Sequence, residues 1–392
     1  MKISLQLAVL SFATSASSAL LAQPVSKAAK RAAAEASAEA VPFKGITTNG
    51  IVEKGLFAIK ATNVSTDQVR KMGEAFLAAL TPEQRKKTLF PVDDSEWRKW
   101  MNQHYYVRQG VSFLEMTPAQ RESAFGLMQA SLSARGFKLS RDIMKLNHVL
   151  AELKDNYSAY GEWLYHITIM GEPSADKPWG WQIDGHHLVI NYFVLRDQVV
   201  VSPLFVGSEP VVARSGKYKG TEILQEEQAR GLAMLRALTP NQRKLAVMET
   251  SKPGNNNVAE AFKDNLVLDY AGVKASALDV KQRAQLLDLV ELFVTYQQPG
   301  HARVKMAEVN THLDRTYFAW IGGDADDSVF YYRVHSPVVL IEFDHQRPVA
   351  LRSSAKDPLQ PVRDHIHVVV RTPNGNDYGK DLLRQHHEQH RH

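Results

Sequence analysis

Polar and apolar residues alternate between Asp364 and Pro373, where Val368 to Val370 favour a strand and the proline ends it. The two faces of this strand are His365, His367 and Arg371 on one side, and Ile366, Val368 and Val370 on the other. Two imidazoles side by side on a stiff element can bind one cation, so the segment is a candidate metal site. The alternative is a half-exposed strand with two surface histidines.

Helical periodicity dominates the chain from residue 61 to 160. The helices are expected at about 67–79, 82–89, 94–105, 118–133 and 140–153. One phrase recurs at Thr81, Thr117 and Thr239, each followed by Pro and then by Gln-Arg, with a weaker echo at Asp279. Thr or Asp as N-cap, Pro at the first helical position and Gln at the third form a capping box. The irregular spacing argues against a solenoid, so the phrase indicates helix starts only.

Strand patterns follow in a first β block over 162–206, with strands at about 163–170, 179–184, 187–195 and 198–201. A helical insert over 221–313 separates it from a second β block over 316–372, and a final helix is expected over 379–388. Within the insert, helices are expected at about 221–238, 240–249, 258–265, 279–296 and 301–313. The predicted fold class is α+β, with a mainly antiparallel sheet built from the two blocks and helices on one face. We expect a single domain over 61–388 and a solvated tail over 389–392.

The composition is that of a globular protein: 392 residues, 44% hydrophobic and 23% charged. A net charge of +5 comes from scattered basic residues with no basic stripe, which argues against a nucleic-acid partner. Cysteine is absent, so disulfides, thiolate metal sites and cysteine nucleophiles are excluded.

The N-terminus has the pattern of a secretory signal peptide over 1–22: Lys2, an apolar run over 3–13, and small residues ending at Ala22. Residues 23–60 are expected to form a flexible leader. The predicted location is therefore periplasmic or secreted, with no membrane anchor after processing.

Alternation through the second β block gathers polar side chains on one face of the expected sheet. Arg333 and His335 share a face with Tyr331, and Glu342 and Asp344 share a face with Leu340. If these strands neighbour the strand of His365 and His367, their polar groups meet. The first block adds His186 and His187 after Gly185, and His187 shares its face with Asn191. The candidate metal ligands are His187, His335, His365 and His367, with His186 as a substitute.

Imidazole and carboxylate groups form a ligand set for a divalent ion, with zinc favoured and iron or copper as alternatives. Glu342 is then a ligand or the general base for a metal-bound water, and Asp344 orients a ligand histidine. Arg333 and Arg371 would bind an anionic small-molecule substrate. Trp179 and Trp181 either wall a cleft or belong to the core. Phosphate-binding loops, zincin motifs and nucleophile elbows are absent from the sequence.

Four separate groups of motifs stand out along the chain: Trp179-x-Trp181 with Gly185-His186-His187-Leu188, Pro203-Leu204-Phe205-x-Gly207-x-Glu209-Pro210, Arg333-Val334-His335-x-Pro337 with Ile341-Glu342-Phe343-Asp344, and His365-Ile366-His367 with Asn376-Asp377-Tyr378-Gly379. Together they resemble the family called domain of unknown function 3500. The likeness covers roughly 80–387 and implies a fold unit without a substrate or a reaction. The residues themselves favour an exported metal-dependent enzyme, and hydrolysis is favoured over oxidative chemistry. The competing hypothesis is an exported ligand-binding protein without catalysis.

Overall fold

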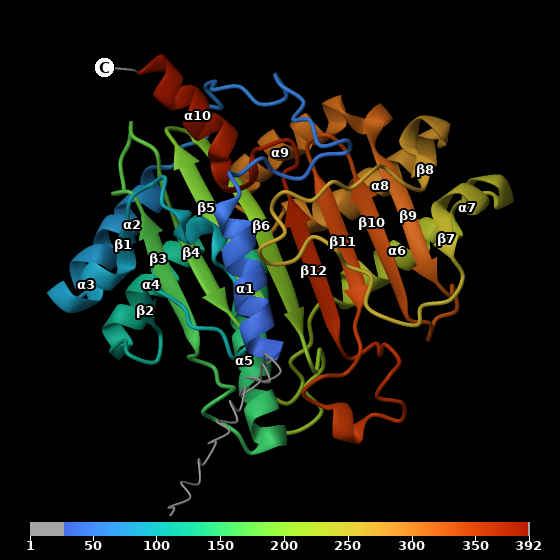
Figure 1. Ribbon diagram of the computed structural model, residues 1–392, viewed down its shortest axis with the longest axis horizontal. Helices are drawn as coiled ribbons and strands as arrows, with labels where there is room; N and C mark the ends of the chain where they lie inside the picture. Colours follow the sequence, from blue (N-terminus) through green and yellow to red (C-terminus); the bar gives the residue numbers. More distant parts are fainter. Residues whose placement is uncertain (1–26, 391–392) are drawn as a thin grey trace, which may run out of the picture.

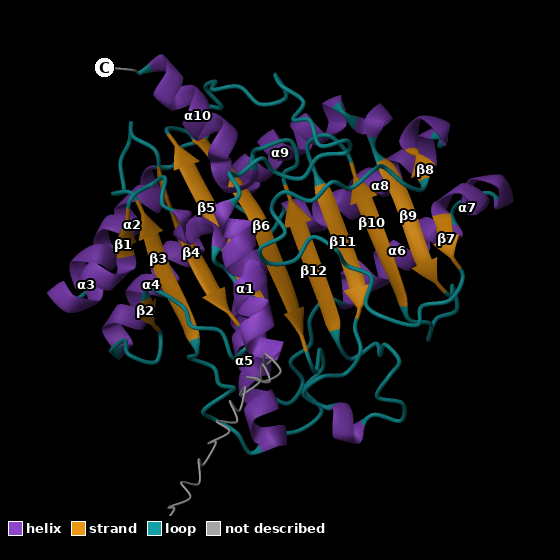
Figure 2. Cartoon of the chain, in the orientation of Figure 1, coloured by secondary structure: helices purple, strands orange, loops and turns teal. Residues whose placement is uncertain are grey.

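The computed structural model describes residues 27–390, and the predicted signal peptide lies outside them. One mixed sheet of 12 strands crosses the molecule in the order β1-β3-β4-β5-β6-β12-β11-β10-β9-β7, with β2 beside β3 and β8 beside β9 (Figures 1 and 2). The pairs β1–β3 and β7–β9 are parallel, and the other pairs in this part of the chain are antiparallel. The predicted α+β class is confirmed.

The strands are β1 Leu89–Phe90, β2 Val111–Ser112, β3 Tyr165–Met170, β4 Trp179–Gly185, β5 Leu188–Leu195, β6 Gln198–Ser208, β7 Val247–Glu249, β8 Val273–Lys274, β9 Tyr317–Gly322, β10 Phe330–His335, β11 Leu340–His345 and β12 Ile366–Arg371. The helices are α1 Lys27–Ala40, α2 Asp67–Ala79, α3 Pro82–Thr88, α4 Pro118–Ser131, α5 Ala134–Lys154, α6 Gln225–Arg236, α7 Pro240–Ala246, α8 Val280–Val294, α9 Pro299–Thr311 and α10 Lys380–Gln389. None of the helices described is long and apolar enough to cross a membrane.

Two apolar cores lie on opposite faces of the sheet. The larger core contains buried residues of α2, α4, α5, α6, α8 and α9, such as Phe76 and Leu289. The smaller core covers the other face and joins Phe193, Phe205 and Val369 of the strands to α10 and to irregular segments. Figure 1 shows α6, α8 and α9 behind the sheet and α1 in front of it. Alternating strand residues therefore face either packed helices or a layer made largely of loops.

The sheet is built from two similar halves that meet where β6 pairs with β12. Each half has an edge strand parallel to its neighbour (β1 or β7), a long loop, a short strand (β2 or β8), a helix pair (α4–α5 or α8–α9) and four consecutive strands. The recurring capping phrase opens α3 and α4 in one half and α7 and α8 in the other. The capping glutamines pair at 2.7 Å in the first half, Gln120 to Gln84, and at 2.9 Å in the second, Gln242 to Gln282. The phrase thus marks helix starts at matching places in two halves of similar element order.

Three segments differ from the sequence prediction. The helix expected at 94–105 is reduced to the short 3-10 turn Ser95–Arg98, and residues 258–265 are not helical. Both stretches run across the sheet, where their backbone amides bond to side chains of the strands instead of to each other. Residues 27–40, within the expected leader, form α1, and Ile46 and Phe57 are buried in the smaller core.

Candidate metal centre

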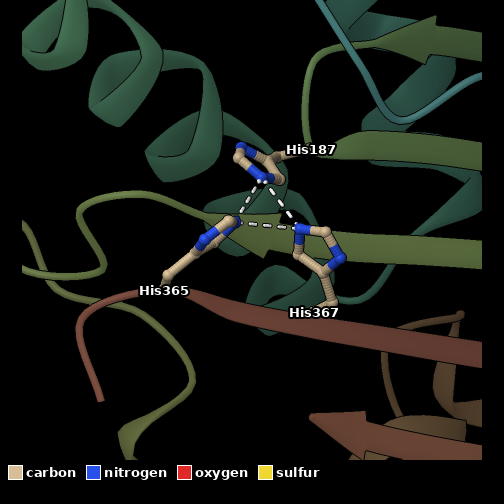
Figure 3. A group of neighbouring side chains, drawn as sticks. All are labelled: His187, His365 and His367. Carbon is tan, nitrogen blue, oxygen red and sulfur yellow. Dashed lines mark hydrogen bonds between the residues drawn. The ribbon is translucent and has the colours of Figure 1, made fainter. Parts of the chain in front are cut away.

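Three histidines from two distant parts of the chain converge on one point. His187 lies in the turn between β4 and β5, His365 just precedes β12, and His367 lies on β12. Figure 3 shows the three rings turned toward one another. Their Nε2 atoms are separated by 3.3 Å (187–365), 3.1 Å (187–367) and 3.0 Å (365–367). Three ligating atoms this close together can hold one metal ion.

The backbone of His187 is held in an uncommon conformation. Its φ is +63°, a region that side-chain-bearing residues seldom adopt. Its N–H donates to the carbonyl of Asn102 at 3.1 Å, and its carbonyl accepts from the N–H of Gly207 at 2.9 Å. Strain of this kind is retained where the surroundings fix it, and here it directs His187 toward β12.

Oxygen acceptors behind the rings fix the tautomers of His365 and His367. The Nδ1 of His365 lies 2.7 Å from the carbonyl oxygen of Arg347, and the Nδ1 of His367 lies 2.6 Å from Oε1 of Glu260. A carbonyl and a carboxylate only accept, so both Nδ1 atoms carry the proton and both Nε2 atoms carry a lone pair. Oε2 of Glu209 lies 3.7 Å from the Nδ1 of His365. This carboxylate–histidine arrangement is the usual support of a metal-ligating imidazole.

Burial keeps the three rings neutral. Their exposed fractions are 6% for His187, 3% for His365 and 7% for His367. Burial lowers the pKa of His187 and of His367 well below the ordinary value, and the neighbouring imidazoles add to this effect. Burial also lowers the pKa of His365. Neutral imidazole is the form that binds a metal, so the group is ready to do so at neutral pH.

The chain matches the model of a family described as "protein of unknown function (DUF3500)" over residues 62–380. The protein belongs to this family. The matched region contains all three histidines together with Glu209 and Glu260. No curated protein and no solved structure matches the chain.

The DUF3500 domain places the other two candidate ligands outside the group. The ring of His186 stacks beside that of His187, but its Nδ1 lies 2.8 Å from Oδ1 of Asn147 and the residue is not one of the three whose ligating nitrogens converge. His335 pairs with Leu340, which pairs with Arg371, so it lies level with the far end of β12, about 13 Å along the strand from His367. Its ring packs against Tyr270 with centroids 4.7 Å apart. Strand alternation had identified the face correctly but not the position along the strand.

Glu342 and Asp344, predicted to be catalytic, are fully buried and bind backbone amides. Glu342 accepts from the N–H groups of Val258 and Ala259 at 2.8 to 3.1 Å and from the hydroxyl of Tyr331 at 2.7 Å. Asp344 accepts from the N–H groups of residues 256 and 257 at 2.8 and 3.1 Å, and forms a fully buried ion pair with Lys252. Both carboxylates thus anchor the segment 252–264 to the sheet.

The two arginines predicted to bind an anionic substrate hold the same region. Arg371 is fully buried, donates to the carbonyls of Ala259 and Ala261, and forms ion pairs with Asp264 and Asp377. Arg333 donates to the carbonyl of Asp269 at 3.2 Å. The segment that these arginines hold carries Glu260, the partner of His367.

Trp179 and Trp181 belong to the larger core, on the helical face of the sheet. Both are fully buried, and Trp181 stacks on Tyr192 with centroids 5.6 Å apart while its Nε1 donates to Ser131 Oγ. Of the two alternatives, the structure supports the core.

Sequence reasoning missed Glu209, Gly207 and Glu260. The first two belong to the motif quoted for the family resemblance, but nothing in that motif placed them beside the histidines. A Cβ at Gly207 would lie 3.3 Å from Cδ2 of both His187 and His367, so the glycine makes room for the two rings. Glu260 lies in a stretch expected to be helical, and only the folded chain shows where that stretch runs.

Proposed function

We propose that this protein is an exported, metal-dependent enzyme whose divalent ion is held by His187, His365 and His367. The observation that carries the proposal is the 3.0 Å separation between the Nε2 atoms of His365 and His367, both of which carry their ring proton on Nδ1. Two lone pairs facing each other at this distance repel, and a cation between them turns the repulsion into coordination.

Zinc is the ion that we favour, with iron or copper as the alternatives, and the spacing of the nitrogens is compatible with a tetrahedral ion. Two nitrogens bound at about 2.05 Å to a tetrahedral ion lie about 3.3 Å apart. The three separations in the group are 3.0, 3.1 and 3.3 Å. A shift of a few tenths of an ångström per ring would complete the geometry.

The proposed reaction is hydrolysis of a small-molecule substrate, either neutral or anionic. Within residues 27–390, no fourth side chain of ligating type joins the three histidines, which leaves a coordination position for water. Zinc lowers the pKa of bound water to about 7 and so supplies a nucleophile at neutral pH. Iron or copper on the same nitrogens would support oxidative chemistry, which is the alternative. Nucleic acid is not a proposed partner, because the basic residues are scattered.

Metal analysis of protein purified without an affinity tag tests the centre. His386 and His390 stack at the C-terminus with centroids 4.5 Å apart and could retain adventitious metal, so the four histidines of the C-terminal segment are first replaced by glutamine. The replaced residues are His386, His387, His390 and His392. We expect about one tightly held ion per chain. The double variant His365→Ala/His367→Ala should lose it and remain folded by circular dichroism.

A double variant of two histidines outside the group, His148→Ala/His312→Ala, is the matched control and should keep the ion. Wild-type protein without bound metal after incubation with zinc would contradict the proposal and favour the alternative of a non-catalytic ligand-binding protein. A metal-loaded protein is then screened against p-nitrophenyl esters and phosphoesters. Turnover that a chelator abolishes and zinc restores would support hydrolysis.

Export to the periplasm or the medium belongs to the same proposal. The support is the pattern of residues 1–22 in the sequence, which precedes the described part of the chain. Expression of the full chain followed by N-terminal sequencing tests it. A mature protein that begins near Gln23 is expected, and an intact Met1 in a cytoplasmic fraction would contradict export.

A further inference from the structure

The hydrogen bonds of Asn147 determine the tautomer of His186. Asn147, on α5, has an exposed fraction of 4%, and its Nδ2 donates to the carbonyl of Gly161 at 2.9 Å. The carbonyl only accepts, so the amide orientation is fixed and Oδ1 must be the atom that lies 2.8 Å from the Nδ1 of His186. Nδ1 therefore carries the proton, and Nε2 of His186 is left with a lone pair.

In the described part of the chain, the hydrogen bond seen at His186 is that of Nδ1, and the exposed fraction of the residue is 8%. Nε2 is not one of the fully enclosed atoms without a partner, so a ligand or water can reach it and supply the donor. The ring of His186 also stacks on that of His187, with centroids 4.0 Å apart and planes at 29°. The free acceptor thus belongs to a ring in direct contact with a metal-ligating imidazole.

Two further rings stand next to His186. His104, in the loop between β1 and β2, and Tyr160, in the loop after α5, have centroids 5.4 and 5.5 Å from that of His186. His104 and Tyr160 contact each other at 4.6 Å, and His104 is only partly buried. Three flat side chains from three separate segments thus form one cluster beside the proposed ion, and flat surfaces of this kind favour a planar ligand group.

We propose that Nε2 of His186 accepts a hydrogen bond from the ligand that binds the metal. The ligand class is a small planar group in which an N–H donor adjoins a metal-binding oxygen, as in amides and hydroxamates. The oxygen coordinates the ion, the N–H points to His186, and the rings of His104 and Tyr160 flank the planar part. This assignment rests on the proposed metal centre and adds the chemistry that selects its ligand.

The test compares benzohydroxamate with N-methylbenzohydroxamate, which binds metal through the same oxygens but lacks the N–H donor. Zinc-loaded protein is titrated with each probe by calorimetry, and the zinc content is measured before and afterwards. The wild type should prefer the N–H probe by about fivefold to tenfold, the effect of one net hydrogen bond. His186→Phe keeps a ring and removes the acceptor, so the preference should fall close to one. His301→Phe, the matched control at a buried histidine of α9 outside the site, should keep the preference.

The outcomes separate this inference from the proposal of a metal centre. Equal affinity of the wild type for both probes, with zinc retained, overturns the role of His186 and leaves the centre standing. A preference for the N–H probe that persists in zinc-loaded His186→Phe would show that another group accepts the hydrogen bond, and it would also overturn the role of His186. Failure of the wild type to hold zinc overturns both. If His186→Phe does not fold, Asn147→Leu, which releases the tautomer, should reduce the preference, and an unchanged preference counts against the assignment.

Discussion

Replacing Gly207 by alanine should disable the metal centre by moving the backbone that carries two of its ligands. Gly207 pairs with His367 across β6 and β12. A Cβ at this position would lie 2.4 Å from the carbonyl oxygen of Ile366, the residue between His365 and His367, and 3.3 Å from Cδ2 of His187. The substitution therefore presses on all three ligand positions through one added methyl group.

The size of the displacement follows from these contacts. Real Cβ atoms essentially never approach a heavy atom within 3.0 Å, so a contact of 2.4 Å requires β6 and β12 to separate by at least 0.6 Å. That is about three times the ±0.2 Å within which metal–ligand distances hold. We expect zinc affinity to fall by more than the roughly 10–100-fold that loss of a supporting residue costs. Overpacking should lower the free energy of unfolding of the apoprotein by about 1–3 kcal/mol.

The matched control is Gly180→Ala on β4. A Cβ there would lie 2.3 Å from the carbonyl oxygen of Tyr192 and 2.7 Å from the ring of Trp97, a similar clash without contact to the histidines. Zinc affinity is measured by competition with a chromophoric chelator, and stability by urea unfolding of the apoproteins. Both variants should lose stability, and only Gly207→Ala should lose zinc. Wild-type affinity in Gly207→Ala, or an equal loss in Gly180→Ala, would refute the reasoning.

Three further predictions concern single side chains. Glu260→Gln removes the charge behind His367, so chelator competition should show zinc affinity about 10–100-fold weaker, and an unchanged affinity would exclude Glu260 from the centre. Glu342→Gln and its matched control Glu227→Gln each alter a buried glutamate bonded to a tyrosine hydroxyl, so both variants should lower the free energy of unfolding by about 1–3 kcal/mol. Only Glu342→Gln should weaken zinc binding, because Glu342 also binds the segment 252–264 that carries Glu260. Equal zinc affinities of the two variants would contradict this anchoring role. Burial lowers the pKa of His335 to about 3, and the charge of Arg333 adds to this effect. Below about pH 6.5 the histidine of the unfolded chain takes up a proton while the buried ring stays neutral, so the free energy of unfolding falls as the pH falls. His335→Phe should therefore show a smaller loss of unfolding free energy between pH 7.5 and 4.5 than wild type in urea titrations of the apoproteins, and identical slopes would contradict the pKa shift.

Local patterns in the sequence were sufficient for two of the three converging histidines. The alternation from Asp364 to Arg371 placed His365 and His367 on one face because strand periodicity is a property of neighbouring residues. His187 required a choice between adjacent histidines, and the shared face with Asn191 favoured the correct one. The α+β class was also predictable, since the helix and strand periodicities are local.

The roles of Glu342, Asp344 and Arg371 could not be predicted in the same way. Their alternation showed a polar face on the sheet, and a polar face suggested chemistry. The structure uses these charges to bind the free amides and carbonyls of segment 252–264, which has no helix to satisfy them. The hydrogen-bonding needs of an irregular segment depend on where that segment runs, and periodicity carries no such information. Glu260 was missed for the same reason.

Comparison of the two similar halves separates what the fold requires from what the centre adds. The stacked pair Trp181–Tyr192 in the first half corresponds in register to the stacked pair Tyr332–Phe343 in the second. Counting from these pairs, the position equivalent to His187 is Val338, whose carbonyl accepts from Nζ of Lys305 at 2.8 Å. The corresponding hairpin of the second half therefore carries valine at this position, without the positive φ of His187, so a hairpin at this place in the sheet does not require an imidazole. Buried imidazoles whose lone pairs face one another are unfavourable for folding, so a His187 that faces His365 and His367 of the other half argues that binding, and not packing, accounts for it.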